Sequence, residues 1–107
     1  MKIIIVTACS VGIAHTYMAA EALEKVGKKM GLELWVETQG CVGIENEVSE
    51  DFIREADLVL IAADMGIEKP GRFDGKIKYE TIPAEAIKRP IEILESAIEE
   101  YKTKQKK

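Results

Sequence analysis

Cys9 and His15 are the residues whose types and spacing first suggest chemistry. They begin and end the stretch C-S-V-G-I-A-H, which lies between an apolar and an amphipathic segment, and His15 is the only histidine of the chain. Small residues and Gly12 let this backbone curl, so that several N–H groups can point inward and bind an anion. The positive end of the following helix adds to that field. Both effects favour a thiolate on Cys9 and a phosphoryl group bound to its sulfur.

Three known kinds of cysteine or phosphate loop were compared with this stretch. A phosphatase loop C-x5-R needs an arginine to clamp phosphate, but His15 holds that position and the first arginine of the chain is Arg54. A thioredoxin-type C-x-x-C is absent, so Cys41 could pair with Cys9 only through space. The lysine of a Walker loop is also missing. The residues favour a cysteine that accepts and passes on a phosphoryl group; the alternative is that Cys9 only packs as a small apolar residue.

The bulk composition is that of one small globular domain. The chain has 107 residues, of which 47% are hydrophobic and 32% charged, enough for one core and too few for two. We expect a single domain over residues 1–103 and a basic tail over residues 104–107. The net charge is −4 and the basic residues form no stripe with aromatic ones, so we expect no nucleic-acid partner.

The apolar runs are too short for a membrane span. Ile3–Val6 and Leu58–Ala63 are the longest, against about 20 residues for a transmembrane helix. Only a brief apolar run follows Met1-Lys2, so no signal peptide is expected. These features predict a cytoplasmic protein with reduced thiols. No cluster of His, Cys, Asp and Glu has the spacing of metal ligands, and we expect neither a metal nor a cofactor.

Apolar segments alternate with amphipathic ones along the chain. We expect strands at residues 2–7, 32–38, 58–63 and 76–80. We expect helices at residues 16–30, 50–55, 83–88 and 90–102. Gly31 is the expected stop of the first helix, and Ser49 the expected cap of the second. This alternation predicts an α/β fold of three layers, α-β-α, around an open four-stranded parallel sheet of the Rossmann-like or flavodoxin-like kind.

In such sheets, ligands bind outside the carboxyl ends of the strands. This rule brings residues 8–15, 39–48 and 64–75 to one rim. The polar rim residues that we consider as contacts for a partner or a phosphate are Gln39, Asn46, Asp64 and Arg72. Loop-ordering hydrogen bonds are the alternative role for Gln39 and Asn46, and a surface position is the alternative for Arg72.

Four segments together resemble the fructose-family enzyme IIB domain of the phosphoenolpyruvate-dependent sugar phosphotransferase system. They are VTACSVGIAHTYMAAEALEK, VETQGCVGIENEVS, ADLVLIAAD and RFDGK. The resemblance runs in order over about residues 1–100 without a gap. The motifs GIAHT-MAAEAL and ETQG-GIEN are specific in combination, because neither is a short pattern that recurs by chance.

The resemblance implies that Cys9 accepts phosphate from a phosphohistidine of an enzyme IIA. It also implies that Cys9 passes this phosphate to a sugar, typically at the 1-position of fructose, held by the membrane-embedded enzyme IIC. The phosphate-binding loop implied in this way consists of Ser10, Val11, Gly12, Ile13, Ala14, His15 and Thr16. The protein would then be a transferase of the cytoplasm, working without a cofactor at the inner face of the cell membrane. Backbone N–H groups suit this task, since phosphoryl transfer is catalysed mainly by positioning and by stabilising charge.

Individual loop residues keep alternative roles. His15 can donate to phosphate and favour the Cys9 thiolate when charged, or it can serve only as a cap. Thr16 can bond phosphate or the first helical turn. Three positions depart from the family pattern: Ser10-Val11 replaces Pro-Thr, and Cys41 replaces a small residue that is not cysteine. The loop is less stiff without proline.

Two other functions stay open at this point. The same fold could serve as a phosphorylation-dependent regulatory module for a transcriptional partner. A small thiol redox enzyme using Cys9 and Cys41 is the second alternative.

Overall fold

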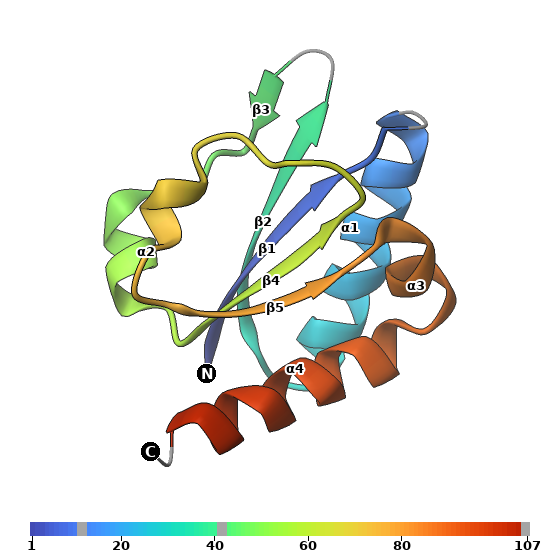
Figure 1. The fold of residues 1–107 in the computed structure, drawn as a ribbon. Coiled ribbons are helices and arrows are strands. Elements are labelled where there is room, and N and C mark those ends of the chain that lie inside the picture. The colour runs from blue at the N-terminus through green and yellow to red at the C-terminus, as the bar shows by residue number, and fades with distance from the viewer. Residues whose placement is uncertain (11–12, 41–42, 106–107) are drawn as a thin grey trace.

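A computed structural model of the chain describes residues 1–10, 13–40 and 43–105. Within these residues the strands are β1 (Lys2–Ala8), β2 (Glu33–Gly40), β3 (Gly43–Glu45), β4 (Leu58–Ala63) and β5 (Ile77–Thr81). The helices are α1 (Ile13–Lys29), α2 (Glu50–Glu55), the 3-10 helix η1 (Pro70–Phe73), α3 (Pro83–Lys88) and α4 (Pro90–Gln105). The strands form one sheet in the order β3-β2-β1-β4-β5 (Figure 1).

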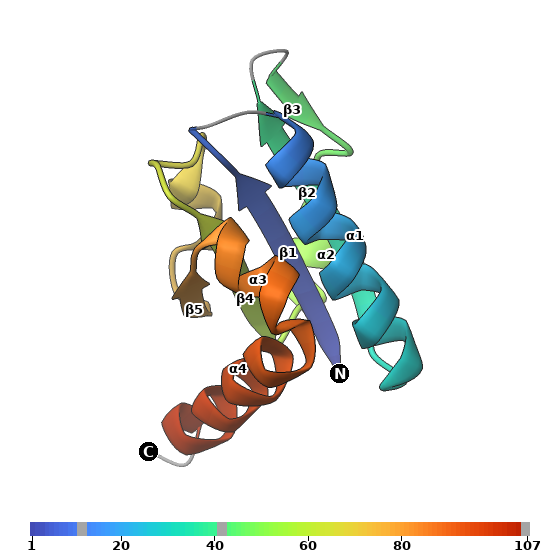
Figure 2. The same cartoon turned by 90° about the vertical axis from the view of Figure 1, so that its right-hand side faces the viewer.

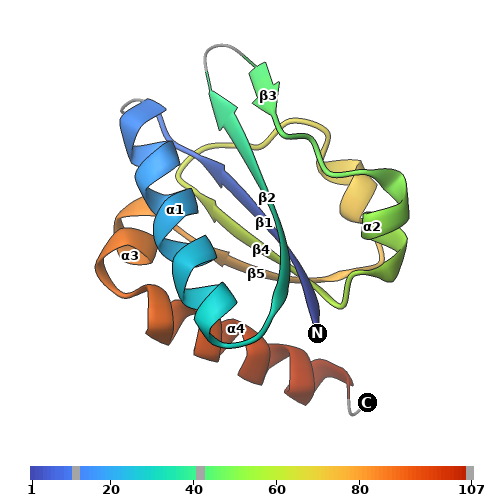
Figure 3. The ribbon, with the colours of Figure 1, turned by 180° about the vertical axis from the view of Figure 1, so that it is seen from behind.

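The sheet is the middle of three layers. Helices α1, α3 and α4 cover the face seen in Figure 2, whereas α2 and η1 lie over the other face, as the view from behind in Figure 3 also shows. Ile3 and Ile5 of β1 pack toward the first group, and Ile4 and Val6 pack toward the second. All four side chains are fully buried because β1 is central and covered on both faces. The predicted α/β class and layering are confirmed.

The sheet has one strand more than the sequence indicated. β2, β1, β4 and β5 are the four expected parallel strands, and β3 pairs antiparallel with β2 at the edge. We expected residues 39–48 to be a loop because glycine is rare in strands. Instead β2 continues to Gly40, which pairs with Gly43. Gly43 has a φ of 98°, a conformation that glycine adopts without strain.

Helix α1 begins three residues earlier than expected, at Ile13 instead of Thr16. The first helical turn therefore includes His15, which the sequence placed before the helix, as well as Thr16, the expected first residue of the helix. The apolar period that located the helix becomes regular only at Met18, so it did not reveal this turn. At the other end Gly31, with a φ of 77°, ends the helix as predicted.

Helix α4 extends through Gln105, beyond the expected limit at residue 102. Lys104 therefore lies inside the helix, where it pairs with Glu100 at 2.9 Å; residues 106–107 lie outside the described part. None of the described helices combines the length and the apolar composition that a bilayer crossing needs.

The chain changes direction across the sheet at β1. Helix α1 leads from β1 to β2 on one face, and α2 leads from β2 to β4 on the other face, so β1 lies between β2 and β4. Ligands bind at such a switch point, outside the carboxyl ends of the two strands where the connections diverge. Here those ends are Ala8 of β1 and Ala63 of β4, which lie side by side in the register.

Candidate functional site

Cys9 directly follows β1 and lies at this switch point, half-buried. It opens onto a pocket of about 630 Å³. The lining residues come from the ends of β1, β2 and β4 and the start of β3: Ala8, Cys9, Ser10, Gln39, Gly40, Gly43, Met65, Gly66 and Glu68. The predicted meeting of three segments at one rim is confirmed.

Two side chains approach the sulfur of Cys9. His15 Nδ1, from the first turn of α1, lies 3.8 Å from Sγ. Asp64 Oδ2, from the segment after β4, lies 3.6 Å from Sγ on a different element. The sulfur is thus placed between an imidazole, which can hold or release a proton, and a carboxylate.

Asp64 is also tied to the backbone of the cysteine loop. Its main-chain N–H donates to the carbonyl of Ala8 at 3.3 Å, which continues the pairing of β4 with β1 by one residue. Its Oδ1 accepts the N–H of Ser10 at 2.8 Å. This backbone hydrogen bond, against a smaller opposing effect of desolvation, lowers the pKa of Asp64 below its ordinary value of 3.8. Asp64 is therefore a carboxylate at neutral pH.

The remaining loop residues are placed as follows. Ser10, Ala14 and His15 are exposed, and Ile13 begins α1. Thr16 is fully buried, its carbonyl accepts the hydroxyl of Thr7 at 3.1 Å, and its own hydroxyl has no hydrogen-bond partner among the described residues. Val11, Gly12 and Cys41 lie outside the described residues. Of these loop residues Ser10 lines the pocket, whereas Thr16 does not.

The pocket contains little positive charge from side chains. Among its described lining residues Glu68 is charged, and no lysine or arginine contributes. Asp64 adds a second carboxylate beside Cys9. A bound anion would therefore depend on backbone N–H groups and on the amino end of α1. Within the described ranges, no three His, Cys, Asp or Glu side chains gather closely enough to hold a metal ion.

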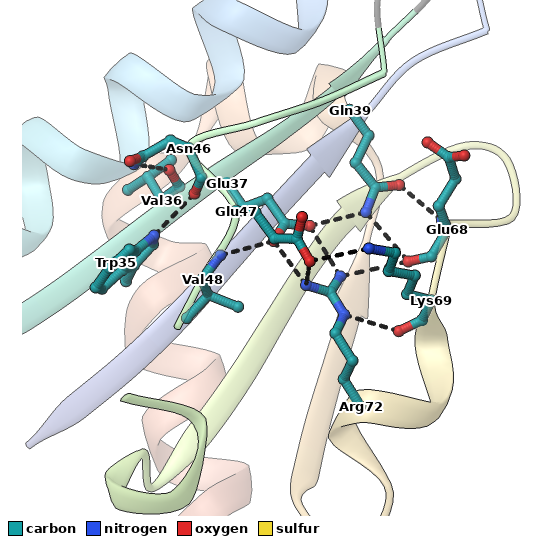
Figure 4. Close-up of polar contacts among 10 residues, drawn as sticks. All are labelled: Trp35, Val36, Glu37, Gln39, Asn46, Glu47, Val48, Glu68, Lys69 and Arg72. Atoms are coloured by element: carbon teal, nitrogen blue, oxygen red, sulfur yellow. Dashed lines mark hydrogen bonds and ion pairs between the residues drawn. The ribbon is translucent and has the colours of Figure 1, made fainter. Parts of the chain in front are cut away.

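A buried ion pair that the sequence did not predict lies under this rim (Figure 4). Glu37 of β2 has no exposed surface, and its two oxygens accept Arg72 Nη1 at 2.8 Å and Nη2 at 2.9 Å. Glu37 also accepts the N–H of Val48 at 3.0 Å and Gln39 Nε2 at 2.8 Å. Burial acts to raise the pKa of Glu37, but the hydrogen bonds from Arg72, Gln39 and Val48 outweigh it and leave the pKa below 4.5.

Arg72 consequently serves neither of the two roles that the sequence suggested, a contact for a partner or phosphate and a surface position. Its side chain is 15% exposed, so the expected surface position is wrong. Besides holding Glu37, it donates from Nε to the carbonyl of Lys69 at 2.9 Å. Lys69 is in the left-handed conformation, with a φ of 53°. The guanidinium fork is thus occupied within the protein, and its described contacts order the segment after β4 rather than face the pocket.

Gln39 connects the same segment to the sheet. Its Oε1 accepts the N–H of Glu68 at 2.8 Å, and its Nε2 donates to the carbonyl of Glu68 at 3.3 Å as well as to Glu37 (Figure 4). Gln39 pairs with Ala8 in the register, directly before Cys9. Its buried amide therefore positions the segment after β4, which carries Asp64 and lines the pocket with Glu68.

Asn46 orders the connection between β3 and α2. It is in the left-handed conformation with a φ of 55°, which asparagine tolerates. Its Nδ2 donates to the carbonyl of Val36 at 2.7 Å, and its own carbonyl accepts Nε1 of Trp35 at 2.8 Å. These contacts match the loop-ordering alternative for Asn46.

The fold and this rim can be compared with known proteins. The sequence model of the family described as "PTS system, Lactose/Cellobiose specific IIB subunit" matches residues 4–96, where PTS denotes the phosphotransferase system. The chain belongs to this PTS IIB family. The matched residues run from within β1 to within the first half of α4 and include every described residue around Cys9.

Similar proteins are named for fructose. The chain is 50% identical over 88 residues to the PTS system fructose-like EIIB component 2 of Escherichia coli strain K12, covering 82% of this chain and 83% of that protein. It is 42% identical over 97 residues to the fructose-specific EIIABC component of Bacillus subtilis strain 168, covering 91% of this chain but 15% of that longer protein. The predicted resemblance to the fructose-type enzyme IIB is confirmed.

A solved structure agrees with the IIB fold. The enzyme IIB subunit of the PTS system from Escherichia coli K12 superposes with a TM-score of 0.86 at 36% identity, covering 99% of this chain and 97% of that one. The chain is therefore a component of a sugar phosphotransferase system, with a role in sugar uptake of the transferase class.

Proposed function

We propose that this IIB domain is a phosphocarrier in which Cys9 receives a phosphoryl group from a phosphohistidine of an enzyme IIA and delivers it to a sugar bound by the membrane enzyme IIC. In the first step the N–P bond of phosphohistidine breaks, an S–P bond forms on Cys9, and the thiol proton replaces phosphorus on the imidazole. In the second step the S–P bond breaks and a sugar hydroxyl oxygen takes the phosphorus, while its proton returns to the sulfur. Fructose is the proposed sugar.

The observation that carries this proposal is the position of Cys9. Its sulfur lies at the carboxyl end of the central strand, at the switch point of the sheet, and it opens onto the pocket. In-line transfer needs a nucleophile that both a donor and an acceptor can approach, with donors preorganised for the equatorial oxygens. We assign this task to the N–H of Ser10, the residue after Cys9, and to the amino end of α1.

The loop lacks what hydrolysis would need. Arg72 is committed to Glu37, and no arginine or lysine is among the described residues that line the pocket. Without a guanidinium to clamp phosphate while water attacks, the loop holds a phosphoryl group until an acceptor arrives. His15 Nδ1, 3.8 Å from Sγ, is the group that we assign to the thiol proton during transfer.

The partners follow from the same proposal. The Bacillus subtilis relative is named as an EIIABC component, so A, B and C components occur together in that protein. We assign this chain a phosphate donor of the IIA kind and an acceptor complex of the IIC kind. Phosphoryl transfer then takes place in the cytoplasm, at the inner face of the membrane. The proposed reaction needs no cofactor.

The test is reconstitution of the relay with labelled phosphoenolpyruvate, the general phosphotransferase proteins and a fructose-type enzyme IIA. We expect label on the wild-type chain and none on Cys9→Ala, with a stability profile in acid and base that identifies thiophosphate rather than phosphohistidine. Cys41→Ser is the matched control and should accept label fully. Vesicles that contain enzyme IIC and fructose should then remove the label.

Each other outcome favours a different function. A Cys9→Ser protein that still supports sugar uptake would refute the carrier. Label that is accepted but never delivered to sugar would favour the regulatory module. Activity that depends on both Cys9 and Cys41 and needs no phosphate would favour the thiol redox enzyme.

A further inference from the structure

A carboxylate occupies the place where the proposed carrier needs its phosphate. Asp64 Oδ1 accepts the N–H of Ser10 at 2.8 Å, and Oδ2 lies 3.6 Å from the sulfur of Cys9. A phosphoryl group on that sulfur would bring three oxygens to the same N–H, because Ser10 is the next residue in the chain. One backbone donor therefore has two competing acceptors, of which one is already part of the protein.

The two acceptors also repel each other. A phosphoryl group carries about −1.5 to −2 charges near neutral pH, and Asp64 carries one more. Apart from His15, whose Nδ1 lies 3.8 Å from the sulfur, no basic side chain is described beside Cys9, because the pocket is lined by Glu68 and by no lysine or arginine. The main chain of Asp64 is held beside Cys9, since its own N–H is bonded to Ala8 and its segment is tied to Gln39 through Glu68. Its exposed carboxylate can turn away from the phosphoryl group only by giving up the hydrogen bond from the Ser10 N–H.

We propose that Asp64 is the internal competitor of the phosphoryl group on Cys9: it fills the anion site of the unloaded protein and, by repulsion, destabilises the loaded one. This inference rests on the proposed function, because it requires phosphate on Cys9. Asp64 raises the tendency of phosphocysteine to give up its phosphate and limits how far the domain is loaded by its donor. A carrier that must deliver to a poor acceptor, such as a sugar hydroxyl, benefits from both effects.

The test is an equilibrium measurement, because a group that only catalyses proton transfer changes rates and leaves the equilibrium unchanged. The full chain is mixed with a fructose-type enzyme IIA that has been phosphorylated through the relay. The ratio of phospho-Cys9 to phosphohistidine is then read by phosphorus NMR. We expect Asp64→Asn to raise this ratio about tenfold, the size expected for like charges in contact at a partly solvated site.

Further variants separate charge from shape. Asp64→Ala should raise the ratio as Asp64→Asn does, whereas Asp64→Glu, which keeps the charge, should stay within about threefold of wild type. The matched control is Asp74→Asn, which also removes one exposed carboxylate but precedes the amino end of β5, whereas Cys9 follows the carboxyl end of β1. Added salt should raise the wild-type ratio more than the Asp64→Asn ratio, because salt screens the repulsion. A purely structural role would not produce this difference.

The outcomes distinguish this inference from the proposed function. A labelled wild-type chain, with ratios in Asp64→Asn and Asp64→Ala that are unchanged or lower, overturns the inference alone. A wild-type chain that takes no label on Cys9 overturns the proposed function, and the inference falls with it.

Discussion

Arg72 and Glu37 form a two-pronged ion pair between η1 and β2, with Nη1–Oε1 at 2.8 Å and Nη2–Oε2 at 2.9 Å. Glu37 is fully buried and Arg72 is partly buried. The pair connects residues 35 positions apart in the chain, so it fixes the segment after β4 to the sheet. The geometry of the pocket depends on that segment, because Met65, Gly66 and Glu68 line it opposite Cys9.

Arg72→Ala should lower the free energy of unfolding by about 3 kcal/mol or more, since it leaves the Glu37 carboxylate buried without its cation. Urea denaturation at pH 7 measures this loss. Arg54→Ala is the matched control: Arg54 also pairs with an acidic residue, Asp51, but its side chain is 67% exposed, and the expected cost is below about 0.5 kcal/mol. Equal losses in the two variants would contradict a special role for the buried pair.

The pH dependence of stability should report on Glu37 itself. Its pKa is lowered in the folded protein, so the folded state binds fewer protons than the unfolded state. The resulting stabilisation is complete above the unfolded pKa, about 4.5, and is lost as the pH falls through the lower folded value. The difference in unfolding free energy between wild type and Glu37→Gln should therefore be largest near neutral pH and shrink below pH 4.5.

Urea midpoints of both proteins, measured from pH 7 down to pH 3, provide the comparison for Glu37. The lowered pKa values of Asp64 and Glu55 also contribute to acid unfolding, but both proteins retain these groups. Their effect therefore cancels in the difference. A difference that stays constant across the acid range would show that folding does not lower the pKa of Glu37.

The sequence was sufficient to predict what depends on local patterns. Continuous apolar runs identified β1 and β4 as buried strands, and Ser49 was predicted as the cap of α2, where its Oγ accepts the N–H of Phe52 at 3.2 Å. The position of Cys9 at the carboxyl end of β1 then followed from the general rule for parallel sheets. The family motifs lie in the same segments, so pattern and resemblance pointed to one rim.

What the sequence did not reveal depends on contacts between distant residues. The alternation in β2 placed Glu37 on the same face as Trp35, but nothing local indicated that Arg72 would cover it. The bond from Ser10 to Asp64 exists because β4 lies beside β1, and this neighbour relationship is a property of strand order. The short strand β3 was missed because its glycines indicate a turn as strongly as they permit an edge strand.

Gln39→Leu should loosen the segment that faces Cys9. The substitution keeps the approximate volume but removes the acceptor of the Glu68 N–H and the donor to the Glu68 carbonyl. We expect a loss of about 1–3 kcal/mol in stability and faster hydrogen exchange at the Glu68 amide. Thr38→Val is the matched control on the opposite face of the same strand. Unchanged exchange at Glu68 would mean that η1 and Arg72 hold the segment without Gln39.

His15→Ala tests whether the imidazole beside Cys9 takes part in transfer or serves only as a cap. If His15 holds the thiol proton, the single-turnover rate of loading from a phosphorylated enzyme IIA should fall roughly tenfold to hundredfold, at the lower end of the range for acid–base groups. Some loading should remain, because the sulfur, the Ser10 N–H and the helix end are still present.

The matched control for His15 is Glu21→Ala, an exposed substitution further along α1 that leaves the surroundings of Cys9 intact. The free energy of unfolding of both variants should stay within about 0.5 kcal/mol of the wild-type value, since both side chains are exposed. Slow loading of the His15→Ala variant together with normal stability therefore indicates a chemical role for His15, because loss of a cap would weaken the helix as well. Normal loading together with reduced stability indicates that the histidine, 3.8 Å from the sulfur, serves α1 alone.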